Sequence, residues 1–246
     1  MGDDGMRLIM FLLLSSMLSF AMSADKADIN TTKSIGVIEN IKGSVKVTKE
    51  GSIKKVKAKK GMDIQKGDLI STASTATALL KLIDGSSVIL DNSSSIHFIN
   101  TKNVEQTTGS IYYKITSRSA KNSLSVKTPF AIIGIKGTTF IVNSQDDDKS
   151  VALKEGKIGI ASIKEEFELY RKKVQEEFTK YKDQQQAAYE QYLREMSGQK
   201  AEMVKEFELY SGNKVVFDDQ KVVESEFSDD TNASFEHFDD ILKSMK

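Results

Sequence analysis

Histidine and cysteine, the residues that most often carry nucleophilic, acid–base or metal chemistry, are scarce in this chain. Its 246 residues include no cysteine and two histidines, His97 and His237, each beside a phenylalanine. Thiolate nucleophiles, disulfides and cysteine metal sites are therefore excluded. Zinc sites and catalytic triads need more partners than two separate histidines supply. We expect no catalytic, cofactor-binding or metal-binding residue, and hence no enzyme.

Two further patterns could suggest a ligand site, and neither has the right context. Asp146, Asp147 and Asp148 could attract a cation, but calcium loops need spaced oxygen ligands and a glycine turn, so we interpret the run as a solvated hairpin tip. Gly134 and Gly137 could cradle a phosphate, but no Gly-Lys-Ser/Thr follows them and no helix is expected there. Backbone geometry is the better explanation of both glycines.

The charge is balanced overall and uneven along the chain. The formal net charge is +0, which gives no electrostatic case for a nucleic-acid partner. Lysines crowd residues 42–66, and the C-terminal part is acidic. Such asymmetry indicates either an interaction surface or a solvated strand face. The residues concerned are Lys54, Lys55, Lys57, Lys59 and Lys60, and Asp218, Asp219, Asp229, Asp230, Asp239 and Asp240.

The N-terminus has the pattern of a secretory signal. Arg7 precedes an apolar run, Leu8 to Met22, and the small residues that follow permit cleavage after Ser23 or Ala24. The run is shorter than the roughly 20 residues that a membrane-spanning helix needs. We therefore expect a signal peptide over 1–24, a polar linker over 25–33, a periplasmic protein and no stable membrane span after cleavage; an uncleaved anchor is the alternative.

Residues 34–163 have the pattern of an all-β domain. Apolar residues alternate with polar ones in short runs about ten residues apart, and Asp84-Gly85 is a hairpin signal between two of them. The densest apolar stretch is Lys127 to Val142, where Pro129, the single proline, is expected at the first residue of a strand or at a bulge. This pattern predicts a sandwich, a roll or a β-helix-like stack.

Seven short phrases in this region resemble the FecR-type periplasmic domain. The resemblance implies an all-β periplasmic domain, in a family whose best-known members pass a signal from an outer-membrane transporter to a sigma factor. The chain departs from the family in having Lys136 where arginine is common, and in a block of different composition near its end. The phrases are Gly36-Val37 with Gly43-Ser44-Val45, Gly67 to Thr72, Leu82 to Val88, Gly109-Ser110-Ile111, Thr128-Pro129, Gly137 to Phe140, and Glu155 to Ile158.

Residues 164–210 differ from the rest in composition. The segment is rich in Glu, Lys, Gln and Ala and lacks proline, which predicts an inserted α-helical hairpin or coiled-coil arm. Its aromatic residues recur with a period of eleven, so they would form one stripe along a helix. We expect this stripe to mediate self-association or to bind an envelope protein through Phe167, Tyr170, Phe178 and Tyr181.

The last segment, 211–246, is expected to complete the β-domain and close with a helix. Ser211-Gly212-Asn213 resembles the turn before the family's final strand, and short strands are predicted at Asn213 to Phe217 and Val222 to Val223. Phe235, Phe238, Leu242 and Met245 follow at helical spacing. Thr231 or Asn232 is the expected N-cap of this helix.

Two functions fit these patterns. The first is a non-catalytic periplasmic interaction or scaffold protein built on a FecR-like domain. The second is a periplasmic sensor or regulator in a transmembrane signalling pathway that acts through a partner protein, as the resemblance implies.

Overall fold

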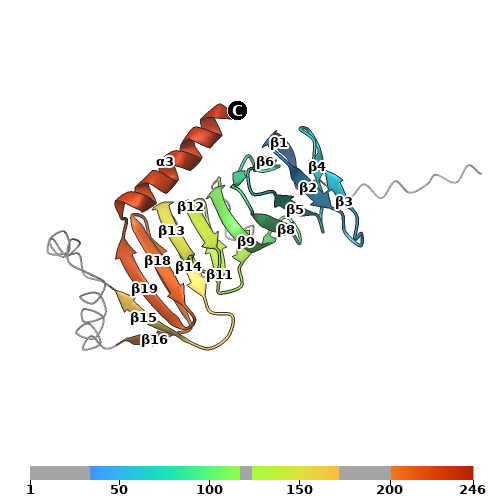
Figure 1. Cartoon of the computed structure of the whole chain (residues 1–246). Coiled ribbons are helices and arrows are strands. Elements are labelled where there is room, and N and C mark those ends of the chain that lie inside the picture. Colours follow the sequence, from blue (N-terminus) through green and yellow to red (C-terminus); the bar gives the residue numbers. More distant parts are fainter. Residues whose placement is uncertain (1–33, 117–123, 172–200, 246) are drawn as a thin grey trace, which may run out of the picture. The chain divides into compact units, whose positions relative to one another are not determined.

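Strands dominate the structure, a computed structural model that describes residues 34–116, 124–171 and 201–245. These residues belong to one compact unit, Lys33–Lys246, and Figure 1 shows their elements. The prediction of a mainly β fold with a C-terminal helix is confirmed. No helix in these ranges is long and apolar enough to cross a membrane. The expected signal peptide and linker lie outside the described residues.

Sheet A runs in the order β4-β1-β6-β7-β9-β12-β13-β18-β19-β15-β16. Adjacent strands in this sheet are antiparallel, except β15 and β19, which are parallel. The strands are β1 (Gly36–Lys42), β4 (Asp63–Ile64), β6 (Thr77–Leu82), β7 (Ser87–Leu90), β9 (Asn103–Lys114), β12 (Thr139–Ser144), β13 (Lys149–Glu155), β15 (Phe167–Arg171), β16 (Glu202–Val204), β18 (Asn213–Asp218) and β19 (Lys221–Glu226).

Sheet B runs in the order β3-β2-β5-β8-β9-β10-β11-β14-β17. Here β9 and β10 are parallel and all other neighbours are antiparallel. The strands that belong to this sheet alone are β2 (Val45–Thr48), β3 (Lys55–Lys57), β5 (Leu69–Thr72), β8 (Ser95–Phe98), β10 (Leu124–Lys127), β11 (Ile132–Ile135), β14 (Lys157–Ala161) and β17 (Glu206–Tyr210).

The inner faces of the two sheets share one hydrophobic core. Ile70 and Phe98 of sheet B and Val88 and Phe140 of sheet A are all buried in it. Alternation along the strands follows from this packing, because in sheet B one face meets the core and the other meets solvent. Burial of this core supplies the main favourable contribution to folding.

Strand β9 belongs to both sheets because it bends at Gly109. Its first half pairs with β8 and its second half with β7 and β12. At the bend, the buried Gln106 side chain provides hydrogen bonds to two backbone carbonyls. Its Nε2 donates to the carbonyls of Gly109 and Val142 at 2.9 and 3.0 Å. The Tyr113 hydroxyl donates to Gln106 Oε1 at 3.0 Å. This network fixes the crossing between the sheets.

Helix α3 (Asp229–Ser244) covers the outer face of sheet A, as Figure 1 shows. The four residues at helical spacing, Phe235, Phe238, Leu242 and Met245, are all buried against the sheet, so the predicted face is confirmed. The N-cap is Ser228, whose hydroxyl accepts from the Thr231 amide at 3.3 Å, and not Thr231 or Asn232. The helix begins earlier than predicted because Asp229 and Asp230 fit its first turn.

The predicted helical insertion over 164–210 is wrong at both of its ends. β15 occupies Phe167–Arg171, and β16 and β17 occupy Glu202–Val204 and Glu206–Tyr210. The middle of the segment, 172–200, lies outside the described residues. Tertiary packing overrides helix propensity here, because these strands place Phe167 and Leu209 in the shared core.

Turn predictions were confirmed in two places and wrong in one. Gly85 and Gly212 both have positive φ in tight turns, after β6 and after β17, as expected from Asp84-Gly85 and Ser211-Gly212-Asn213. Pro129 lies in the turn between β10 and β11 and not at the start of a strand. The turn is held by the Thr128 side chain, whose Oγ1 accepts from the Ala131 amide at 2.9 Å.

Candidate functional site

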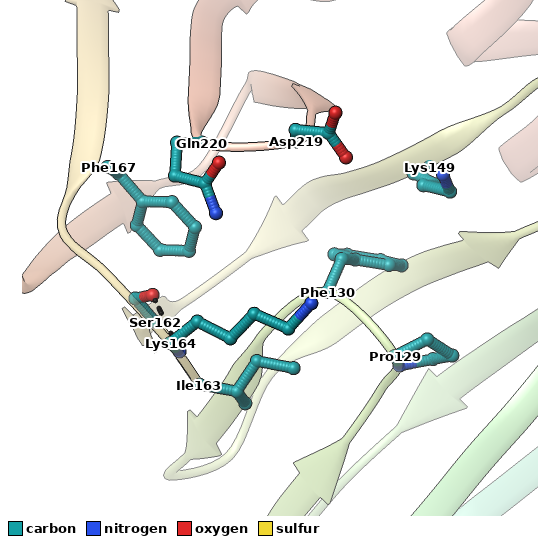
Figure 2. A pocket seen from close by; sticks show the side chains of 9 residues that line it. All are labelled: Pro129, Phe130, Lys149, Ser162, Ile163, Lys164, Phe167, Asp219 and Gln220. Atoms are coloured by element: carbon teal, nitrogen blue, oxygen red, sulfur yellow. Dashed lines mark hydrogen bonds between the residues drawn. The ribbon is translucent and has the colours of Figure 1, made fainter.

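A pocket of about 230 Å³ opens at the rim where turns from both sheets meet. Figure 2 shows the nine side chains that line it. They come from the β10–β11 turn, the start of β13, the segment after β14, the start of β15 and the β18–β19 turn. The residues are Pro129, Phe130, Lys149, Ser162, Ile163, Lys164, Phe167, Asp219 and Gln220.

Aromatic rings form the apolar part of the pocket. Phe130 and Phe167 both line it, and both contact Phe217, with ring centroids 4.7 and 5.6 Å from the Phe217 ring. Phe167 also lies edge-on to Phe207 at 5.9 Å. Because Phe167 and Phe217 are anchored in strands of sheet A and Phe130 in a turn of sheet B, the packing of the two sheets fixes the shape of this surface.

Two lysines supply the charge of the pocket. Lys164 is exposed, and in Figure 2 its ammonium group extends toward Phe130 across the opening. Lys149 is half-buried on the β13 side. Neither lysine has an ion-pair partner among the described residues. Asp219 is the acidic group of the lining, in a turn where its φ is 50°, so the pocket carries a net positive charge.

The hydrogen bonds around the pocket hold its backbone in place. The Ser162 hydroxyl accepts from the Lys164 amide at 3.2 Å, a contact drawn in Figure 2. The Gln220 carbonyl accepts from the Glu168 amide at 2.8 Å, which ties the β18–β19 turn to β15. These two bonds fix the segment after β14 and the β18–β19 turn, two of the five segments that line the pocket.

This arrangement suits the binding of a small apolar group. The lining holds no histidine beside a serine and no paired carboxylates. Its volume is below the roughly 300–1,000 Å³ of small-molecule sites, and its aromatic wall lies beside ammonium groups. An apolar side chain next to a carboxylate, as at a protein C-terminus or in an acidic peptide, fits this surface.

The four residues expected on an exposed aromatic stripe are not on one helix. Phe167 is buried, with 2% of its surface exposed, and it forms part of the core and of the pocket. Tyr170 faces outward on β15, with Lys221 Nζ 5.3 Å from its ring centroid. Phe178 and Tyr181 lie outside the described residues. Partner binding through Tyr170, Phe178 and Tyr181 stays a prediction. The position of Phe167 is explained by its packing in the core.

The acidic run and the two histidines are not brought together as a site. Asp148 accepts from the Asn143 amide at 2.9 Å and from the Ser150 hydroxyl at 2.7 Å, so it braces the β12–β13 hairpin. His237 lies on α3, and its Nε2 is 3.4 Å from the Asp91 carboxylate. Within the described parts of the chain, no three His, Cys, Asp or Glu residues are grouped to hold a metal ion.

Apart from Phe167, which was expected to bind a partner as part of a helical stripe, the pocket residues were not predicted from the sequence. Lys149, Lys164 and Gln220 belong to segments far apart in the chain, and none lies in a recognisable motif. The Thr128-Pro129 phrase, which lies beside the pocket, was noted as part of the family resemblance, and Pro129 was expected at the first residue of a strand or at a bulge.

Comparison with known proteins gives a family match to the central part of the chain. The family model described as FecR protein matches residues 68–159. The match covers β5 to β14 and therefore most of the β-domain expected over 34–163. The comparison with curated proteins gave no match.

Two solved structures of a candidate anti-sigma factor from Parabacteroides distasonis resemble part of this chain. One has 13% sequence identity and a TM-score of 0.46, over 68% of this chain and 63% of that one. The other has 14% identity and a TM-score of 0.44, over 64% of this chain and 59% of that one. The chain thus spans less than two thirds of the length of either structure.

Proposed function

We propose, because residues 68–159 match the family model described as FecR protein, that this protein is a non-catalytic regulator that passes a signal by binding a partner protein. The family match is the observation that carries this proposal. It favours the sensor or regulator function over the scaffold function, since FecR family members are regulatory proteins of the cell envelope.

The pocket at the rim where turns from both sheets meet is the recognition site in this proposal. Phe130 and Phe167 provide an apolar wall, and Lys149 and Lys164 provide two unpaired cations beside it. A partner segment with an apolar residue next to a carboxylate would bury the first against the rings and place the second near the ammonium groups. Charge and shape together would select such a segment over a neutral one.

The compartment in this proposal is the periplasm. The support is the secretory pattern of residues 1–24 in the sequence and the envelope association that is typical of FecR family proteins. In this proposal, a signal received there reaches transcription through the partner protein.

Site-specific photo-crosslinking in intact cells tests whether the pocket binds a partner. A photoreactive amino acid replaces Lys164 in one strain and the exposed Lys66, in the turn before β5, in a control strain. We expect a discrete protein adduct from position 164 that is lost when Phe130→Glu is added, and none from position 66. Equal adducts from both positions, or an adduct indifferent to Phe130→Glu, would contradict a partner site at the pocket.

A further inference from the structure

Both sheets end in open edges at the two ends of the described unit. At one end the edge strands are β3 in sheet B and β4 in sheet A. At the other end they are β17 in sheet B and β16 in sheet A. Among the described residues, each of these four strands pairs with one neighbouring strand. An unpaired edge presents backbone N–H and C=O groups that another chain can use.

The two edges of sheet B carry opposite charges on the same face. Val56 of β3 is opposite the buried Val47, so Lys55 and Lys57 point to the outer face of the sheet. At the far edge, Phe207 and Leu209 of β17 are buried, so Glu206 and Glu208 point to that same outer face. One edge is therefore basic and the other acidic, with the same alternation of inward and outward side chains.

The directions of the edge strands fit a continued sheet. Following the pairs from β3 through β2, β5, β8, β9, β10, β11 and β14 to β17, the strand direction reverses at every step except the parallel pair β9 and β10. β3 and β17 thus run in opposite directions. If the sheet of one copy continues into the next copy in the same orientation, β17 of the first lies antiparallel to β3 of the second.

One register pairs all the outward side chains favourably. If Val56 lies opposite Phe207, then Lys55 lies opposite Glu208 and Lys57 opposite Glu206. The same register places Ile53, just before β3, opposite Tyr210. These two side chains are 100% and 51% exposed in the described unit, so each gains apolar contact in the pairing.

We propose that the partner of these edges is a second copy of this chain, with β17 of one copy added to β3 of the next. Symmetric pairing of β3 with β3 would oppose lysines, and pairing of β17 with β17 would oppose glutamates, so charge selects the head-to-tail arrangement. Such an interface does not close on itself and produces open-ended association. Glu208 already pairs with Lys157 at 2.6 Å, whereas Glu206, Lys55 and Lys57 have no ion-pair partner among the described residues.

Charge reversal at each edge, followed by sedimentation velocity of the purified chain over a range of concentrations, tests this interface. The wild-type chain is expected to show a sedimentation coefficient that rises with concentration and falls with added salt. Lys55→Glu/Lys57→Glu makes both edges acidic, and Glu206→Lys/Glu208→Lys makes both basic. Each variant alone should associate roughly tenfold more weakly than the wild type.

An equimolar mixture of the two variants is the decisive sample. Each acidic edge then meets a basic one, so association should return to the wild-type level, and the chain that carries all four substitutions should associate as well. Matched controls are Lys66→Glu/Lys136→Glu and Asp146→Lys/Asp147→Lys, which change the charge equally at exposed turns and should leave association unchanged. A wild-type chain that stays monomeric at millimolar concentration, a symmetric dimer unaffected by the edge variants, or a mixture that does not recover would overturn the proposal.

Discussion

The Tyr112 hydroxyl in β9 donates a hydrogen bond of 3.0 Å to the Asp239 carboxylate in α3. Lys154 of β13 binds the other carboxylate oxygen at 2.7 Å. The Tyr112 ring stacks on Phe238, with centroids 5.5 Å apart. Polar and apolar contacts therefore join at one point to hold the C-terminal helix on sheet A.

Asp239 makes this contact sensitive to acid. Burial alone would raise the pKa of the Asp239 carboxyl, but the hydrogen bonds from Lys154 and Tyr112 outweigh it and lower the pKa below its ordinary value of 3.8. A depressed native pKa contributes stability that is present above the unfolded value and is lost as pH falls toward the native pKa. The loss should therefore begin near pH 4.

We expect the wild-type chain to lose more stability between pH 5 and pH 2.5 than Asp239→Asn, which cannot titrate at this position. Chemical denaturation followed by circular dichroism at both pH values measures the difference. Asp240→Asn is the matched control, because its carboxylate is exposed and pairs with Lys243 within α3. Identical pH dependence in wild type and Asp239→Asn would show that the contact contributes nothing.

Phe140→Ala should destabilise the fold strongly. The Phe140 side chain is fully buried and its ring stacks on Tyr113 at 4.8 Å. Its removal leaves a cavity between the sheets and should cost about 3 to 5 kcal/mol. Lys60→Ala, at an exposed position, should cost less than about 0.5 kcal/mol. Denaturation midpoints that shift equally in the two variants would place the core elsewhere.

Two glycine-to-alanine variants distinguish a position that requires glycine from a position where a side chain fits. Gly109 has a φ of 86°, and a Cβ there would collide with the Cα and Oγ of Ser94. Gly109→Ala should therefore cost about 2 to 4 kcal/mol and disturb the crossing of β9 between the sheets.

Gly159→Ala is the matched control, because no atom lies within 4 Å of the added Cβ. Its effect should be within about 0.5 kcal/mol of the wild type. Both variants can be compared by thermal melting. If Gly109→Ala melts with the wild type, β9 does not depend on the left-handed conformation at this residue.

The β-domain and the closing helix could be predicted from the sequence because each follows one local periodicity. Alternation predicted the strands up to Ile163, and the spacing of Phe235, Phe238 and Leu242 predicted the buried face of α3. The phrase Glu-Phe-Glu-Leu-Tyr occurs at 166–170 and again at 206–210. Its Phe and Leu alternate as in a strand, and this signal was outweighed by the helix-favouring composition around it.

The pocket could not be predicted in the same way, because its residues become neighbours only when the two sheets pack. Phe130 and Phe167 are far apart in the chain and lie in different sheets, and both contact Phe217. Lys149 and Lys164 line the same pocket as these rings only in the folded chain. Local periodicity carries no information about such a convergence.

The regulatory role is tested most directly by transcript levels in cells of the source organism that lack this protein. We expect its loss to change the transcription of a defined set of genes, and the wild-type gene to restore it. Lys149→Glu/Lys164→Glu, which reverses the charge of the pocket, should fail to restore it, whereas Lys66→Glu/Lys136→Glu should succeed at the same protein level. Unchanged transcripts on loss of the protein, or full restoration by the folded pocket variant, would contradict a regulator that acts through this pocket.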